Sequence, residues 1–251
     1  MENEIEQKRR VYWVCKTASQ ALLKRGFAFA EDKTAEIYRR AEPGRVEFVA
    51  GSRYLQRGRY CPSVVRDLYL GNASRWRLLR RITKKTKYSH KYTFAPDGKM
   101  LIAETVTSET GKKNSEYLIY EGSTVLGFTF DDGGTLVTLS AEEYTEGKLQ
   151  SYFCASCFIN KKEQLDFGIT QMLYEEYTHD EVGFADVTIY NVSPYIEDPS
   201  CDDEIAELIS YYKYHFIREN NLLIGGQPAN SNSKLYFSIP KHVMTGISIL
   251  A

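Results

Sequence analysis

The residues of this chain best suited to chemistry lie close together, between positions 175 and 180. Glu175, Glu176, His179 and Asp180 combine three carboxylates with one imidazole. A histidine oriented by a carboxylate can act as a general base, and such a set can also bind a divalent metal. These residues are the candidate site of a hydrolase. The same pattern is typical of a solvated acidic loop, so the sequence assigns no catalytic residue, no metal and no cofactor.

Cys154 and Cys157 form a C-x-x-C pair, the spacing found in redox dithiols and in half of a zinc site. A redox pair normally begins a helix, and a zinc ribbon needs a second pair, which the sequence lacks. This pair lies in an aromatic, strand-like segment, where residues three apart point to opposite faces. We therefore expect buried, reduced cysteines. The odd total of five cysteines agrees with this interpretation.

Cations alternate with aromatic residues in the first half of the chain. Between Arg53 and Lys91 twelve basic residues accompany a single acid, Asp67. In sites for single-stranded nucleic acid, cations pair with phosphates and bases stack on aromatic rings. The candidate nucleic-acid-binding residues are Arg75, Trp76, Arg77, Arg80, Arg81, Lys84 and Lys85. Alternatively, these side chains face solvent from a strand, or they dock on the acidic half of the chain.

The total charge of −1 conceals two halves of opposite sign. Residues 1–99 contain 23 basic and 10 acidic residues, whereas residues 100–251 contain 9 basic and 23 acidic ones. Either the halves pair within one fold or each attracts a separate molecule. The candidate partner-binding residues are the acids of a predicted C-terminal helix, Asp202, Asp203, Glu204 and Glu207.

Several common functional classes lose support because their motifs are absent. The sequence contains no G-x-x-x-x-G-K-[ST], G-x-G-x-x-G, H-E-x-x-H or G-x-S-x-G motif.

The N-terminal residues are acidic without an apolar segment, and no uncharged run approaches the ~20 residues that span a bilayer. We expect a cytoplasmic protein with no membrane association.

Helical periodicity appears first near the N-terminus. Val11, Cys15, Ala18 and Leu22 recur at spacings of three and four, and Gly26 is the predicted end of this helix. A second, short helix is predicted over residues 32–41. A C-terminal helix is predicted to begin at the acids of residues 202–204, with a long apolar stripe formed by Ile205, Leu208, Ile209, Tyr212 and Phe216.

Strand-like alternation occupies the centre of the chain. Residues 75–158 alternate apolar and polar side chains, and glycine-containing turn signals interrupt them at hairpin spacing: Pro-Asp-Gly at 96–98, Glu-Gly at 121–122, Asp-Asp-Gly-Gly at 131–134 and Glu-Gly at 146–147. This pattern predicts six to eight antiparallel strands there. Residues 184–192 read as another strand, residues 234–250 are a candidate last strand, and residues 168–181 fit no single assignment.

These elements predict an α+β protein with a central curved antiparallel meander of about 8–10 strands. The N-terminal part, residues 1–74, is the basic helical or mixed segment, and residues 75–192 form the meander. Residues 193–251 are the acidic loop, the amphipathic helix and the terminal strand. We expect the three parts to form one continuous domain.

One hairpin resembles a known repeat. Residues 92–101, YTFAPDGKML, are similar to the Tyr/Asp hairpin repeats (YD repeats) of Rhs-type proteins, in which an aromatic strand enters an Asp/Gly turn. Residues 130–136 are a second match. Similar hairpins recur in small cytoplasmic immunity proteins that neutralise bacterial polymorphic toxins. The resemblance implies a hairpin architecture. The meander, the acidic second half and the lack of a catalytic constellation favour a non-enzymatic role with another protein, such as a toxin domain, as partner.

The leading functional prediction is therefore a protein-binding module of immunity or regulatory type that acts through its charged surface. Binding of single-stranded nucleic acid and a hydrolase activity are the alternatives. The sequence leaves the oligomeric state and any small-molecule ligand open.

Overall fold

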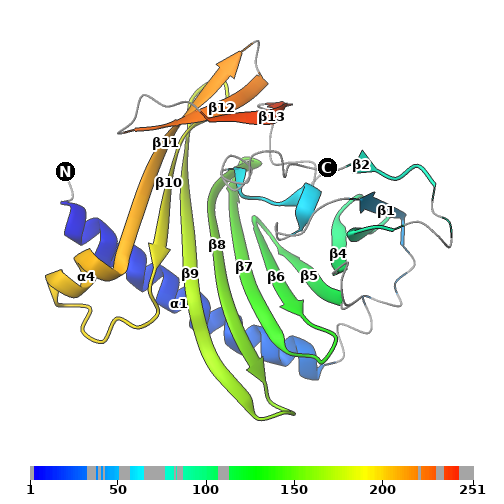
Figure 1. Cartoon of the computed structure of the whole chain (residues 1–251), viewed down its shortest axis with the longest axis horizontal. Coiled ribbons are helices and arrows are strands. Elements are labelled where there is room, and N and C mark those ends of the chain that lie inside the picture. The colour runs from blue at the N-terminus through cyan, green and yellow to red at the C-terminus, as the bar shows by residue number, and fades with distance from the viewer. Residues whose placement is uncertain are drawn as a thin grey trace.

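The described chain forms one long antiparallel sheet crossed by a long helix (Figure 1). The computed structural model describes residues 3–32, 38, 41, 43–50, 57–64, 77–81, 83, 87–106, 113–219, 222–229 and 235–242. Within them the fold is α+β and dominated by strands, as expected.

The sheet has 13 strands in the order β13-β12-β11-β10-β9-β8-β7-β6-β5-β4-β3-β1-β2. From β3 onward each strand pairs with the next one in the chain, so eleven strands form a simple meander. The strands are β1 (Arg45–Ala50), β2 (Arg77–Leu78), β3 (His90–Phe94), β4 (Met100–Val106), β5 (Lys113–Glu121), β6 (Thr124–Phe130), β7 (Leu136–Thr145), β8 (Lys148–Asn160), β9 (Leu165–His179), β10 (Phe184–Val192), β11 (Ile209–Glu219), β12 (Leu222–Pro228) and β13 (Leu235–His242).

The hairpin turns that the sequence predicts are confirmed. The β7–β8 turn illustrates the chemistry, because Glu146 and Gly147 both have positive φ angles, 51° and 74°. Two successive positive φ angles match the right-handed twist of the flanking strands, and glycine adopts them at little cost. The sheet is nevertheless longer than expected. Most of residues 168–181, which fit no single assignment, lie in β9 (Leu165–His179), and the second half of the predicted C-terminal helix lies in β11.

Helix α1 (Glu4–Glu31) begins with a capping box in which the Asn3 side chain accepts from the backbone of Glu6. The predicted end at Gly26 is wrong, because the helix continues for more than another turn. Gly26 lies instead where the helix approaches the sheet: an added Cβ would be 3.0 Å from Cδ1 of Phe128 and 3.2 Å from Cδ2 of Leu136. Gly26 therefore allows α1 to pack closely on the sheet and does not end the helix.

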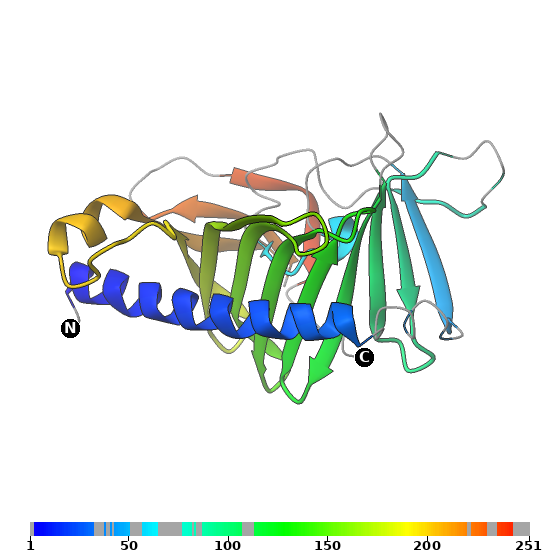
Figure 2. The ribbon, with the colours of Figure 1, turned by 90° about the horizontal axis from the view of Figure 1, so that it is seen from below.

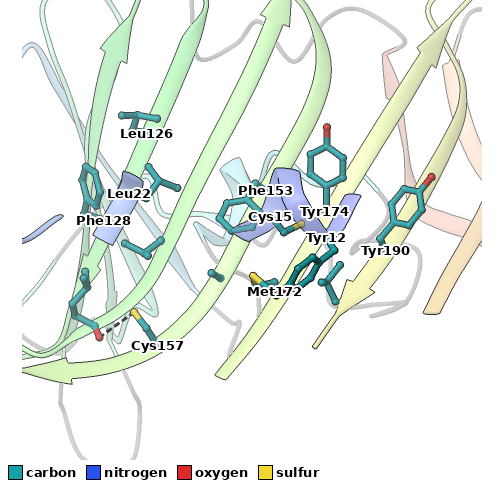
Figure 3. Close-up of a cluster of buried hydrophobic side chains, with 14 of the residues drawn as sticks. Tyr12, Cys15, Leu22, Leu126, Phe128, Phe153, Cys157, Met172, Tyr174 and Tyr190 are labelled. Carbon is teal, nitrogen blue, oxygen red and sulfur yellow. Dashed lines mark hydrogen bonds between the residues drawn. The ribbon is translucent and has the colours of Figure 1, made fainter. Parts of the chain in front are cut away.

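The two faces of the sheet carry separate apolar clusters. On one face α1 lies across the strands (Figure 2), and its buried side chains Tyr12, Cys15 and Leu22 contact residues such as Phe128 and Phe153 (Figure 3). The opposite face holds a second cluster. Its members include Tyr92, Phe94, Leu118, Tyr144, Tyr152, Tyr177 and Val187. The sheet is therefore the shared wall of two cores.

The predicted long C-terminal helix is mostly a strand. Helix α4 spans only Asp202–Leu208, and the chain then enters β11. The acidic start was located correctly, and Ile205 is fully buried against the α1 side. Beyond Leu208, however, the run is rich in Tyr and Ile, which favour strands. The edge of β10 provides a partner for it, with Tyr190 opposite Tyr211.

Other predicted elements have mixed outcomes. The strands at 184–192 and in the C-terminal tail are present as β10 and β13. The predicted helix at 32–41 falls largely outside the described residues, although Tyr38 is described and its ring lies 6.0 Å from that of Phe29. No described helix combines the length and the apolar character that crossing a bilayer requires.

Candidate protein-binding surface

The structure separates the four candidate hydrolase residues. Glu175 and Glu176 are neighbours on β9 and therefore point to opposite faces of the sheet. Glu175 is buried, and it accepts hydrogen bonds from Oγ of Ser63 at 2.6 Å and from the hydroxyl of Tyr177. Glu176 lies on the α1 side, where Arg10 donates to it at 2.8 Å.

His179 and Asp180 lie at the end of the same strand and serve separate local contacts. The ring of His179 packs 4.8 Å from Phe184, its Nε2 lies 2.7 Å from the carbonyl oxygen of Leu149, and burial lowers its pKa. The hydrogen bond from Arg218 lowers the pKa of Asp180 to about 2. These residues and the two glutamates do not form the single cleft that hydrolase chemistry would need.

The C-x-x-C cysteines are both buried, and they lie on opposite faces. Cys157 belongs to the α1-side cluster and donates a hydrogen bond to the carbonyl oxygen of Leu136 at 3.3 Å (Figure 3), whereas Cys154 belongs to the other cluster. Burial raises the pKa of Cys157 to about 12. A protonated, enclosed thiol is a poor nucleophile, so the geometry supports packing.

A buried polar network that the sequence analysis did not indicate lies on the face opposite α1. The fully buried guanidinium of Arg57 donates from Nε to Glu116 at 2.8 Å, from Nη2 to Oγ of Ser140 at 2.9 Å, and from Nη1 to Glu142. Burial alone would lower the pKa of Arg57, but the two carboxylates outweigh it and hold the pKa well above its usual value. We call Arg57, Glu116, Ser140, Glu142 and Tyr144, whose hydroxyl donates to Glu142, the Arg57 network.

The Arg57 network and a second contact attach residues 57–64 to the sheet. The hydroxyl of Tyr92 donates to the carbonyl of Arg57 at 2.9 Å and accepts from the backbone of Arg59 at 3.0 Å. At the end of this segment, the hydroxyl of Ser63 donates a hydrogen bond to Glu175, and the backbone N–H of Val64 donates one to the hydroxyl of Tyr177. These ionisable groups therefore cross-link the core. A sequence signal existed for the burial of these acids. Glu142 and Glu175 each lie two residues before a buried tyrosine, Tyr144 and Tyr177, so in a strand they point to the same face as that tyrosine.

Only part of the candidate nucleic-acid surface is described. Arg77 is in β2, where it pairs with Ala50, and Arg80 and Arg81 follow it as exposed residues. Arg75, Trp76, Lys84 and Lys85 lie outside the described residues. The aromatic residues further on do not form an open stacking platform. The ring of Tyr88 packs edge-on at 5.0 Å from Phe48, and Tyr92 is buried.

Two of the four candidate partner-binding acids hold α4 in place. Asp202 forms an ion pair with Arg9 of α1. Glu204 accepts hydrogen bonds from the backbone N–H groups of Glu197 and Asp198 at 3.0 and 3.1 Å, and so closes the loop that precedes α4. Their removal would disturb the local structure as well as the surface charge.

The other two acids face outward. Asp203 and Glu207 are exposed and one helical turn apart, so they lie on the same side of α4. Neither carboxylate forms an ion pair with a residue of the described part of the chain. Their charge is therefore directed to solvent.

Large aromatic side chains are exposed on the loop that precedes α4 and on α1. Tyr195 is 67% exposed in the loop before α4, and Trp13 is 49% exposed on α1. The loop and the helix meet where the Tyr12 hydroxyl donates to the carbonyl of Ile196 at 3.4 Å. We call residues 3–13 and 193–208, which contain eight acids and three cations, the acidic end of the molecule.

The opposite charges of the two halves are partly satisfied inside the fold. Arg9, Arg10 and Arg25 of α1 pair with Asp202, Glu176 and Glu121, and Arg57 and Lys91 pair with other acids of the second half. Internal pairing, one of the alternatives left open by the sequence, accounts for these residues. It does not account for Asp203 and Glu207.

Comparison with known proteins adds no relative to this description: no protein-family model matches the chain, and no curated protein matches it significantly.

Proposed function

We propose that this protein is a non-enzymatic binding module of the bacterial cytoplasm whose acidic end docks on a basic surface of another protein. An immunity-type factor that masks the cationic substrate groove of a toxin, such as a nuclease domain, fits this role. The observation that carries the proposal is that Asp203 and Glu207 are exposed on α4 and that Tyr195 is exposed in the loop that precedes this helix.

Charge and aromatic area contribute differently to such an interface. Uncompensated acids attract a basic partner over several ångströms and raise the association rate, an effect that salt weakens. Exposed Tyr and Trp are the residues most often found to supply binding energy once water is excluded. The acidic end contains both, whereas the buried acids of the Arg57 network are enclosed and cannot contact a partner.

The partner can be found and tested in one design. A photo-crosslinking amino acid replaces Tyr195 in the full chain, and the adducts formed in cells are identified by mass spectrometry. We expect a partner with a basic surface whose crosslink is lost when Asp203→Lys and Glu207→Lys are combined. Glu146→Lys with Glu163→Lys is the matched control, because it changes the net charge equally at exposed turns elsewhere.

Kinetics with the purified partner then decide the mechanism. The Asp203→Lys/Glu207→Lys variant should associate about tenfold or more slowly at low salt, while the turn variant keeps the wild-type rate. Equal association rates for the wild type and the α4 variant would refute the acidic end as the docking surface.

Binding of single-stranded nucleic acid is a second proposal, favoured by the exposure of Arg80 and Arg81. Filter binding of single-stranded DNA and RNA at low salt tests it. Retention should fall on Arg80→Glu/Arg81→Glu, and the absence of retention by the wild type would eliminate the proposal.

A further inference from the structure

The acidic end has a counterpart at the far end of the same molecule. Figures 1 and 2 place α4 at one end of the long axis and strands β1 and β2 at the other. The strand order explains the separation, because β1 and β2 close one edge of the sheet while α4 follows β10 beyond the middle of the meander. The two ends of one copy therefore cannot touch each other.

Exposed cations gather at the β1–β2 edge. Arg80, Arg81 and Lys87 are exposed, and the side chain of Arg45 is 55% exposed. The one acid in β1 and β2 is Glu47; its side chain is 17% exposed, forms an ion pair with Arg45 and accepts a hydrogen bond from the hydroxyl of Tyr60. We call Arg45, Arg80, Arg81 and Lys87 the basic edge.

Both ends also expose apolar side chains among their charges. At the basic edge Val46 and Leu78 are 37% and 38% exposed, and at the acidic end Trp13 and Tyr195 are exposed to a greater extent. Opposite charge brings two surfaces together, and apolar contact holds them. Each end thus exposes both charge and apolar area. The complementary surface lies at the other end of the same copy, which it cannot reach.

We propose that the basic edge of one copy docks on the acidic end of a second copy, giving head-to-tail assemblies. The contact joins two different surfaces, so it leaves one of each free in every dimer and allows further copies to add. This self-association goes beyond the partner binding proposed above. Because both use the acidic end, a second copy and a partner compete for it.

Salt dependence is the first test. Sedimentation velocity is run on nuclease-treated full-length protein at about 0.01 M and about 1 M salt, where charges act over about 30 Å and about 3 Å respectively. We expect dimers and longer chains at low salt that dissociate to monomers at high salt. A wild-type protein that stays monomeric at low salt and high protein concentration would overturn the proposal.

Complementary variants give the second test. Asp203→Lys/Glu207→Lys keeps only the basic edge intact, and Arg80→Glu/Arg81→Glu keeps only the acidic end intact, so each should be monomeric alone. Mixed together at low salt, they should form a dimer through the one intact pair of ends and extend no further. A mixture that remains monomeric would show that these surfaces do not meet.

The same variants separate self-association from the proposed function. Arg80→Glu/Arg81→Glu should lose self-association but still bind the crosslinked partner, because its acidic end is intact. Circular dichroism confirms that each variant is folded. A wild-type protein that self-associates but crosslinks to no partner would reject the proposed function alone.

Discussion

At the scale of single residues, the central feature is a guanidinium placed where water cannot reach it. Arg57 lies in the same core as aromatic side chains, and its donors are directed to two carboxylates and a hydroxyl. Gly127 makes room for this arrangement: an added Cβ would lie 2.3 Å from both Oε1 of Glu116 and Oγ of Ser140. The network therefore depends both on the residues that form it and on a glycine at position 127, where any side chain would overlap it.

Truncation of Arg57 should be far more costly than truncation of an exposed arginine. We expect Arg57→Ala to lower the free energy of unfolding by about 3–5 kcal/mol, because Glu116 and Glu142 would remain buried without their cation. Arg25→Ala, which breaks a solvent-exposed pair with Glu121, should cost about 1 kcal/mol or less. Urea denaturation of both variants measures the difference. A loss below about 1 kcal/mol for Arg57→Ala would mean that water replaces the cation.

At the scale of elements, the hairpin turn signals were interpreted correctly, whereas the predicted helix end at Gly26 and the predicted helix after Leu208 were wrong. The hairpin turns were predictable because an Asp-Gly or Glu-Gly pair determines its own backbone, whatever the rest of the chain does. The segment after Leu208 was misassigned because its Tyr-rich stripe fits both a helix and a strand. Pairing with β10 decided between them, and this partner is set by the preceding fold.

The candidate binding surface also has features that the sequence predicts and features that only the fold determines. The acids at the start of α4 could be identified from the sequence, since negative charge at a helix start is a local preference. Which of these acids anchor α4 and which face outward could not be predicted from the sequence, because Arg9, the partner of Asp202, lies 193 residues away. The Arg57 network joins residues 59 and 85 positions apart, so only an acid in phase with buried aromatic residues could have hinted at it.

Gly26 gives an element-scale prediction about the approach of α1 to the sheet. We expect Gly26→Val to lower the free energy of unfolding by about 1–3 kcal/mol more than Ala30→Val, because its side chain would overlap Phe128 and Leu136. Ala30 is exposed in the same helix, so its substitution measures the helix cost of a β-branched residue alone. Chemical denaturation compares them. Equal losses would show that the helix shifts to accommodate the valine.

At the scale of the whole molecule, one sheet links everything that the structure describes. Neighbouring residues of β8 illustrate this: Phe153 packs on the α1 side, and Tyr152 packs in the opposite cluster. The loss of one cluster should release the strands that form the other. Paired charges lie along α1 and in the core of this sheet, while Asp203 and Glu207 at one end and Arg80 and Arg81 at the other are exposed.

This shared sheet predicts a single unfolding transition. In a Trp76→Phe variant, Trp13 is the only tryptophan, so its fluorescence reports the α1 side while far-ultraviolet circular dichroism reports the strands. We expect both signals to give the same urea midpoint, because coincident probes are the mark of a cooperative unit. The circular dichroism midpoint of the wild type controls for the substitution. A tryptophan signal that changes first would mean that α1 detaches from a sheet that is stable by itself, and that the two cores are energetically separate.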